Sequence, residues 1–284
     1  MTNANNSASQ PSISVVVSVR NEEKRLAECL QTVLANCPDE VIVVDGGSTD
    51  ATVAIARSFS GVTVIESPNS NLTRDRQKGI DAARNDLIAM IDADHRLEPD
   101  DIASLYKDLI EFQLDIVQSG LVSHASHGFW DSAEEASWEL THNNPPGARS
   151  MIGTAPAIYR KKVFDHARFD DHITATIDDT DFIYRLSRFP ELRFGVGRTK
   201  VRQHHFADFR TYVKKFQWYG KGDGEFCRKH PGRAPSMIFH LLVRYPVFYS
   251  WRALRSGNFR AIPFFMLQGL LRFTGLVRYF LKII

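Results

Sequence analysis

Short apolar runs alternate with amphipathic segments along the first part of the chain. The apolar runs are rich in β-branched residues and predict buried strands at 12–19, 39–47, 62–67 and 86–92. Apolar residues at helical spacing and capping residues predict helices at 20–37, 48–59, 73–84 and 98–110. Asn21 is a candidate N-cap for the first helix. Short buried strands that alternate with helices predict an α/β fold, with a parallel sheet covered on both faces.

After about residue 119 the alternation loosens. We expect a helix over 130–141, a mobile loop over 142–150, a strand and then a helix over 154–165, and a helix over 178–189. The first turn of the last helix carries Asp178, Asp179 and Asp181. Acidic residues there have a purely structural explanation, because they stabilise a helix N-terminus.

Polar residues follow three of the predicted strands. Arg20, Asn21 and Glu22 follow the first strand, Asp45 ends the second, and Asp92 ends the fourth. Ligands of parallel α/β sheets bind beyond the carboxyl ends of the strands. We therefore expect these side chains to meet in one crevice.

Asp92 and Asp94 are separated by a single residue. In an extended segment two such side chains point the same way and repel each other unless a cation lies between them. Mg²⁺ and Mn²⁺ prefer carboxylate oxygens and leave room for substrate phosphates. A metal site is one interpretation, and a solvated loop end is the other.

The segment Asp45-Gly46-Gly47 has two interpretations as well. Two glycines permit a tight strand-to-helix turn, or they let the backbone approach a nucleotide whose base N–H bonds to Asp45. The spacing is not G-x-G-x-x-G, which disfavours a dinucleotide fold.

The length fits one large α/β domain, or a domain with a C-terminal appendage. The 284 residues are 43% hydrophobic, and Cys29, Cys37 and Cys227 show neither metal-type nor disulfide spacing, as in a reduced cytosolic protein. Residues 1–11 are polar and predict a disordered tail rather than a signal peptide.

The charge is divided unevenly. Residues 226–284 hold 10 of the 35 Lys and Arg and none of the 33 Asp and Glu. Within this tail, residues 237–255 and 261–284 are apolar with interspersed Arg and Lys, and Arg272, Arg278 and Lys282 share one face of the second segment. We expect basic amphipathic helices in a membrane interface, since the longest uncharged run is too short to cross about 30 Å of hydrocarbon. Helices that cap the core or form a dimer are the alternative, and nucleic-acid binding is disfavoured because the arginines interrupt an apolar segment.

Four segments together resemble the family 2 glycosyltransferases of the GT-A fold. They are ISVVVSVRNEEKRLAECLQTVL, EVIVVDGGSTDAT, RDRQKGIDAARNDLIAMIDAD and IDDTDFIYRL, in the family's order. The resemblance covers residues 12–225 and implies a GT-A type, Rossmann-like, mostly parallel sheet with C-terminal amphipathic helices. It implies a nucleotide-binding half at 12–118, an acceptor half at 119–225 and a basic apolar helical tail at 226–284.

The resemblance also assigns roles to single residues. It implies that the nucleotide sugar contacts Val19, Arg20, Asn21, Glu22, Asp45, Arg76 and Asp92. Asp94, together with Asp92, would hold Mg²⁺ or Mn²⁺, and His205 of the His204-His205 pair is a further candidate metal ligand. Gln77 stands where the family usually has asparagine, and Asp178 where it usually has glutamate.

Asp179 would be the catalytic base that deprotonates the acceptor hydroxyl in an inverting transfer. Trp218 and Lys221 are candidates for closing over the sugar nucleotide, with a plain surface loop as the alternative. Trp130 and Trp138 are candidates for stacking on an acceptor sugar, although core packing is the more common fate of tryptophan.

These features predict a metal-dependent inverting glycosyltransferase that uses a UDP-sugar and a glycan or lipid-linked acceptor at the inner face of the plasma membrane. A non-catalytic scaffold that binds nucleotide sugars at the membrane is one rival. A sugar-nucleotide pyrophosphorylase is another, but it needs a glycine-rich basic loop after the first strand, where this chain has RNEEKR.

Overall fold

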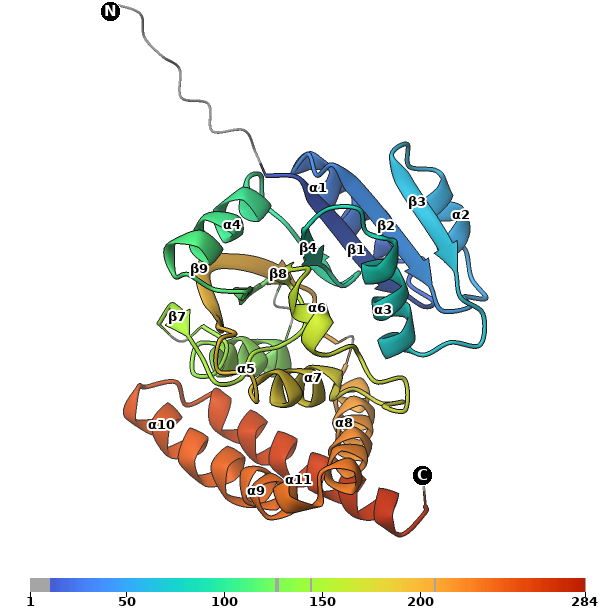
Figure 1. Cartoon of the computed structure of the whole chain (residues 1–284). Coiled ribbons are helices and arrows are strands. Elements are labelled where there is room, and N and C mark those ends of the chain that lie inside the picture. Colours follow the sequence, from blue (N-terminus) through green and yellow to red (C-terminus); the bar gives the residue numbers. More distant parts are fainter. Residues whose placement is uncertain (1–10, 126–127, 144, 207, 284) are drawn as a thin grey trace, which may run out of the picture.

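The computed structural model describes residues 11–125, 128–143, 145–206 and 208–283. All but the last residue of the predicted disordered tail, 1–11, lies outside the described residues. The described residues form an α/β fold in which helices cover a single large sheet (Figure 1). This confirms the predicted fold class.

The sheet contains all the strands, which run in the order β3-β2-β1-β4-β8-β6-β9-β5, with β7 paired to β9. Their bounds are β1 Ile13–Val19, β2 Glu40–Asp45, β3 Val62–Glu66, β4 Leu87–Met90, β5 His95–Arg96, β6 Ile116–Ser123, β7 Gly147–Ala148, β8 Ala157–Arg160 and β9 Phe194–Gln203. The first four strands are parallel, and β8 runs antiparallel between β4 and β6. The sheet therefore spans both predicted halves of the catalytic domain.

The helices fill the connections and form the C-terminal region. They are α1 Leu26–Ala35, α2 Thr52–Arg57, α3 Leu72–Ala82, α4 Asp101–Glu111, α5 Phe129–Trp138, α6 Val163–His166, α7 Asp178–Leu186, α8 Phe209–Lys229, α9 Ala234–Phe239, α10 Ser250–Arg255 and α11 Ala261–Phe280. A 3₁₀ turn, Pro231–Arg233, precedes α9, and a π-helical segment, η2 His240–Tyr249, joins α9 to α10.

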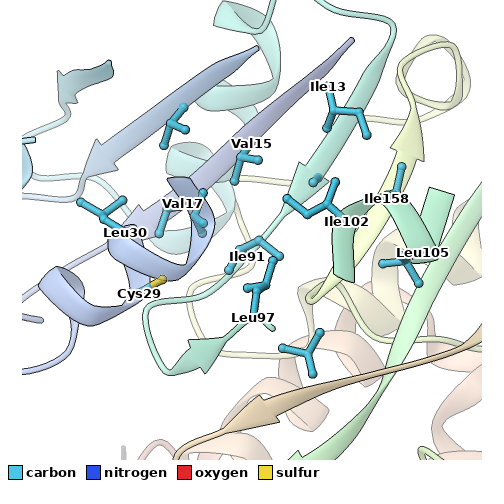
Figure 2. Close-up of a cluster of buried hydrophobic side chains, with 14 of the residues drawn as sticks. Ile13, Val15, Val17, Cys29, Leu30, Ile91, Leu97, Ile102, Leu105 and Ile158 are labelled. Atoms are coloured by element: carbon cyan, nitrogen blue, oxygen red, sulfur yellow. The ribbon is translucent and has the colours of Figure 1, made fainter. Parts of the chain in front are cut away.

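Alternate residues of β1 pack into two cores on opposite faces of the sheet. Val15 and Val17 lie with Leu30 of α1 and Ile102 of α4 on one face (Figure 2). Val16 lies on the other face in a cluster that includes Ile80 of α3 and Phe182 of α7. Burial on both faces is why β1, β2 and β4 read as continuous apolar runs.

The predicted cap of the first helix is wrong. α1 begins at Leu26, and Asn21 has a φ of 56°, in the left-handed region that asparagine tolerates. Its side-chain Oδ1 accepts a hydrogen bond from the Thr49 N–H at 2.9 Å. Asn21 therefore ties the end of β1 to the turn after β2.

The C-terminal helices pack at the end of the molecule far from β2 and β3, where α11 contacts α5 and α8 (Figure 1). Gly220 of α8 and Gly275 of α11 let these helices touch, since a Cβ on either would collide with a backbone carbonyl of the other helix. The segment 216–229, for which a surface loop was one prediction, is helical, and α8 runs without a break across the predicted boundary at residue 225.

The prediction for α11 is wrong in one respect. The Arg272 guanidinium forms a buried ion pair with Asp223 of α8, with N–O distances of 2.9 and 2.6 Å, so it does not face outward with Arg278. No helix in the described part of the chain combines the length and the apolar character needed to cross a membrane.

Candidate active site

Arg76 joins two segments that are distant in the sequence. They meet beyond the carboxyl ends of the parallel strands, a region that we call the mouth of the sheet. It lies on α3, and its Nη2 is 3.0 Å from Oδ1 of Asp92, which follows β4. Its Nη1 bonds to the Asp178 carboxylate at the start of α7. The side chains of Arg76 and Asp178 are buried, whereas that of Asp92 is 34% exposed, so Asp92 opens to solvent.

The charges in this group are mutually compensated. Burial favours neutral Arg76, but Asp178 and Asp92 outweigh it and keep the pKa of Arg76 above its ordinary value. Burial also favours protonated Asp92, yet Arg76 and His95 hold the pKa of this carboxyl below its ordinary value. Asp92 therefore remains ionised, and one arginine neutralises a large part of the repulsion between two carboxylates.

Asp179 differs from its neighbour Asp178. The Asp178 carboxylate bonds to Arg76 and, at 3.3 Å, to the Thr154 hydroxyl, whereas Asp179 bonds only to its neighbour Thr180 in the described structure. Burial, followed by the charge of Asp178, raises the pKa of Asp179 to about 6. Asp179 is thus more basic than an ordinary aspartate, and it makes fewer contacts than Asp178.

The backbone that precedes these acids is held by α8. Glu225 accepts hydrogen bonds from the backbone N–H groups of Thr174 at 2.9 Å and of Ala175 at 3.1 Å. Ile177 has a φ of 146°, a strained value for a β-branched residue. The strained residue lies directly before the acidic pair, so the contacts with α8 stabilise the conformation that presents Asp179.

The buried Asp181 carboxylate attaches helix α7 to the end of α8. This carboxylate bonds to Lys229 and His230 at the end of α8, each at 2.8 Å, and to Arg185 at 2.9 Å. The C-terminal helices therefore position the helix that carries Asp179.

Asp92, Asp94 and His95 could hold a cation, because their ligand atoms lie within 4.8 Å of one another. The His95 Nδ1 accepts the backbone N–H of Asp92, which leaves its Nε2 3.8 Å from Oδ1 of Asp94. The Asp94 carboxylate receives a hydrogen bond from Gln203 at 3.2 Å and is 23% exposed. Two partly exposed carboxylates beside a buried imidazole suit Mn²⁺ or Mg²⁺.

The residues after β1 line the same mouth. Val19 is buried, and Arg20 and Asn21 are exposed. The backbone N–H of Glu22 donates to the Thr52 hydroxyl at 2.8 Å, and burial raises the pKa of the Glu22 carboxyl, with Asp94 adding to the rise. The structure thus places the segment 19–22 beside the aspartates.

Asp45 has the structural role that the sequence left open. Its Oδ2 accepts the N–H groups of Gly47 at 3.0 Å and Ser48 at 2.9 Å, and the residue is 2% exposed. It closes the turn after β2, and its contact with a nucleotide base stays a prediction.

The sequence analysis missed Asp75, which lies beside Gly46. Asp75 is 4% exposed, its Oδ1 has no hydrogen-bond partner among the described residues, and its Oδ2 would lie 2.5 Å from a Cβ at position 46. An unsatisfied buried carboxylate oxygen is costly and marks a position suited to a ligand N–H. One signal in the sequence pointed to a role of Asp75 at the site, namely its position directly before Arg76 on the first turn of α3.

His205 is not brought into the aspartate cluster. Its Nδ1 lies 2.6 Å from the Glu134 carboxylate, its Nε2 lies 2.8 Å from the Ser123 hydroxyl, and its ring stacks on Trp138. Because both nitrogens are engaged, the geometry favours His95 over His205 as the histidine beside the aspartates. Trp138 is 4% exposed, which corrects the prediction that it stacks on an acceptor.

Other aromatic candidates remain accessible. Trp130 stacks on Phe209 with ring centroids 4.8 Å apart, and Trp218 is 36% exposed with Lys215 5.1 Å from its ring. The Lys221 Nζ lies 4.0 Å from the carboxylate of Glu225, the side chain that accepts hydrogen bonds from the backbone of residues 174 and 175.

Comparison with known proteins identifies the family. The model of the family described as "Glycosyl transferase family 2" matches residues 14–168, more than half of the chain. The chain belongs to glycosyl transferase family 2. This family 2 chain also resembles curated bacterial glycosyltransferases, but the first three relatives are matched over only about a third of their own length or less.

Two of these relatives show the range of similarity. Glycosyltransferase GlyA of Streptococcus pneumoniae is 26% identical over 215 residues, which are 71% of this chain and 28% of GlyA. Dodecaprenyl-phosphate galacturonate synthase of Rhizobium johnstonii is 36% identical over 116 residues, which are 37% of this chain and 34% of the synthase.

Solved structures agree in fold. TarS from S. aureus matches with a TM-score of 0.57 at 16% identity, over 88% of this chain and 54% of TarS. Its 1–349 fragment, solved in complex with UDP, matches with a TM-score of 0.55 at 15% identity, over 95% of this chain and 92% of the fragment. The family 2 chain therefore has a GT-A-like fold that includes its C-terminal helices.

Proposed function

We propose that the family 2 chain is a metal-dependent, inverting glycosyltransferase that moves a sugar from a UDP-sugar to a glycan or lipid-linked acceptor. The observation that carries the proposal is the Arg76 bridge, which brings the acid after β4 and the acidic start of α7 to one mouth. Family membership and the UDP complex of the structurally similar TarS support it.

Asp179 is the base in this proposal. Its raised pKa makes it a stronger base than an ordinary aspartate while leaving it ionised at neutral pH. It accepts the proton of the acceptor hydroxyl as that oxygen attacks the anomeric carbon, and the sugar–phosphate bond breaks. No covalent enzyme intermediate is needed, and Asp178 stays bonded to Arg76 throughout.

The residues at the mouth hold the donor. Asp94, with Asp92 and His95, would hold Mg²⁺ or Mn²⁺, which when bound neutralises the departing diphosphate. Val19 to Glu22 and the Asp45 turn line the nucleotide, and Asp75 offers its free oxygen to an N–H of the base.

We also place the chain at the inner face of the plasma membrane. Exposed apolar residues gather on the segment 238–259, which carries Arg244, Arg252 and Arg255 and no acid. This surface suits an anionic lipid interface better than α11, whose Arg272 is buried. The name of the Rhizobium relative, a dodecaprenyl-phosphate galacturonate synthase, supports a lipid-linked acceptor.

A donor panel tests the proposal. Release of UDP from a set of UDP-sugars, with Mn²⁺ and crude lipid or glycan acceptors, should single out one donor. Asp94→Ala should weaken Mn²⁺-dependent UDP binding while the protein stays folded. Metal-independent UDP binding of equal strength in both forms would defeat the metal role, and binding without any turnover would favour the scaffold alternative.

A further inference from the structure

A second group of metal-type ligands lies on the α1 face of the sheet. Glu28 comes from α1, His124 directly follows β6, and His204 directly follows β9. Their ligand atoms lie within 4.8 Å of one another. Because β6 and β9 are paired as far as Ser123 and Gln203, the two histidines extend from neighbouring strand ends toward the same carboxylate.

Hydrogen bonds between these three side chains do not explain why they lie together. The Nε2 atoms of His124 and His204 each lie 3.6 Å from an oxygen of Glu28, which is too long for a hydrogen bond. The Nε2 of His204 is buried and has no hydrogen-bond partner among the described residues. The two rings lie close, with centroids 4.1 Å apart. Donors on a tetrahedral Zn²⁺ at about 2.0–2.1 Å would be about 3.3 Å apart. The two separations of 3.6 Å, each to a different oxygen of Glu28, are slightly longer than this.

We propose that Glu28, His124 and His204 form a Zn²⁺ site that is separate from the aspartate site. Two imidazoles and one carboxylate suit zinc, whereas the aspartate site suits oxygen-preferring Mg²⁺ or Mn²⁺. A bound zinc would tie α1 to the ends of β6 and β9, and the backbone N–H of His204 in turn donates to the carbonyl of Asp94 at 2.9 Å. The zinc therefore stabilises the loop that presents Asp94.

Arg96 orients the carboxylate of this site. Its Nε lies 2.7 Å from Oε2 of Glu28, and its Nη1 donates to the backbone carbonyls of Ala93 and His95. A fixed second partner holds a ligand in one orientation, as outer groups of zinc sites do. Its positive charge also opposes the cation, so we expect moderate rather than very tight affinity.

Zinc titration of the full chain tests the proposal. The titration uses the Asp94→Ala variant as its background, because this change removes one ligand of the aspartate site. This protein is treated with a chelator and then titrated with Zn²⁺ alone, and calorimetry measures the binding. We expect one equivalent of zinc, and we expect His204→Ala, His124→Gln and Glu28→Gln each to weaken binding by at least about tenfold. Co²⁺ in place of Zn²⁺ should give the visible absorption of a tetrahedral site, which the same variants lose.

His166→Ala is the matched control. The His166 Nδ1 lies 3.9 Å from a single carboxylate, that of Glu191, so its loss should leave zinc binding unchanged. Circular dichroism verifies that each variant is folded, and three independent ligand variants guard against the failure of one to fold. The proposal is overturned if folded variants bind zinc as tightly as the background, or if the background binds none.

Discussion

Two buried arginines, one in each half of the chain, differ in what surrounds their partners. Arg76 bridges Asp92 and Asp178, and the Asp92 side chain is still 34% exposed. Arg272 pairs with Asp223, whose side chain is 0% exposed, and also donates to the Tyr245 hydroxyl at 3.2 Å. In both cases the acidic partners keep the pKa of the arginine above its ordinary value despite burial.

The comparison shows that a buried charge by itself does not mark a functional site. The pair in the C-terminal helices is enclosed by protein and joins α8 to α11, so it is structural. The group around Arg76 has a carboxylate that opens to solvent beside two further metal-type ligands, so it can bind a ligand. Opening to solvent, rather than burial, distinguishes the two.

The largest effect should come from Arg76→Met. Removing the guanidinium leaves Asp92 and Asp178 without their shared partner, so we expect loss of UDP binding and of transfer. Unfolding free energy should fall by about 3–5 kcal/mol, the usual cost of breaking a buried pair. Urea unfolding and UDP titration measure the two effects, and a variant with normal transfer would contradict the bridge.

Arg272→Met should have a similar cost in stability and no cost in binding. Buried Asp223 loses its partner, so unfolding free energy should fall by about 3–5 kcal/mol in urea denaturation. Addition of Asp223→Asn removes the stranded charge and should restore part of the loss. If the folded single variant loses UDP binding, the distinction between the two arginines fails.

The pH dependence of transfer should report Asp179. Because its pKa is raised to about 6 and the base must be ionised, kcat/KM should fall as the pH drops through about 6. The negative charge of Asp178 contributes to the rise, so Asp178→Asn should move the acidic limb to lower pH. An acidic limb that stays in place, or moves upward, would assign it to another group.

The smallest effect concerns the outer surface of the C-terminal helices. Trp251 is 54% exposed, and Trp251→Ser should weaken cosedimentation with anionic liposomes by about tenfold, since a large apolar side chain no longer enters the interface. Phe129 is also 54% exposed but lies on α5, so Phe129→Ser is the matched control. Equal loss in both variants would contradict a membrane face on the segment 238–259.

The N-terminal half of the fold could be predicted because its signals are local. β1, β2 and β4 are buried along almost their whole length, and each gives an apolar run that the sequence alone reveals. β3 gives a similar run, although its residues are only half-buried or exposed. β9 could not be predicted in the same way, since FGVGRTKVRQ contains two glycines and three basic residues. Gly195 is needed where β7 approaches, a contact between segments nearly 50 residues apart that no local pattern encodes.

Some residues of the candidate site could likewise be predicted from the sequence, whereas others could not. The Asp-x-Asp element and the acids of α7 stand out in the sequence, and the structure brings both to Arg76. The resemblance had already singled out Asp179 rather than Asp178 as the base, a prediction with which the Arg76 contact of Asp178 agrees. The choice of His95 over His205 needed the partners Ser123 and Glu134. Arg272 looked like a surface charge because its partner Asp223 lies 49 positions away.

Asp179→Asn tests the central claim most directly. This change preserves the shape of the side chain and removes its basicity, so the account predicts that UDP binding stays within about twofold while transfer falls by at least about a hundredfold. Both are measured on the same folded protein, by calorimetry with UDP and Mn²⁺ and by product formation with the donor identified in the panel. Undiminished transfer by the variant would show that Asp179 does not serve as the base.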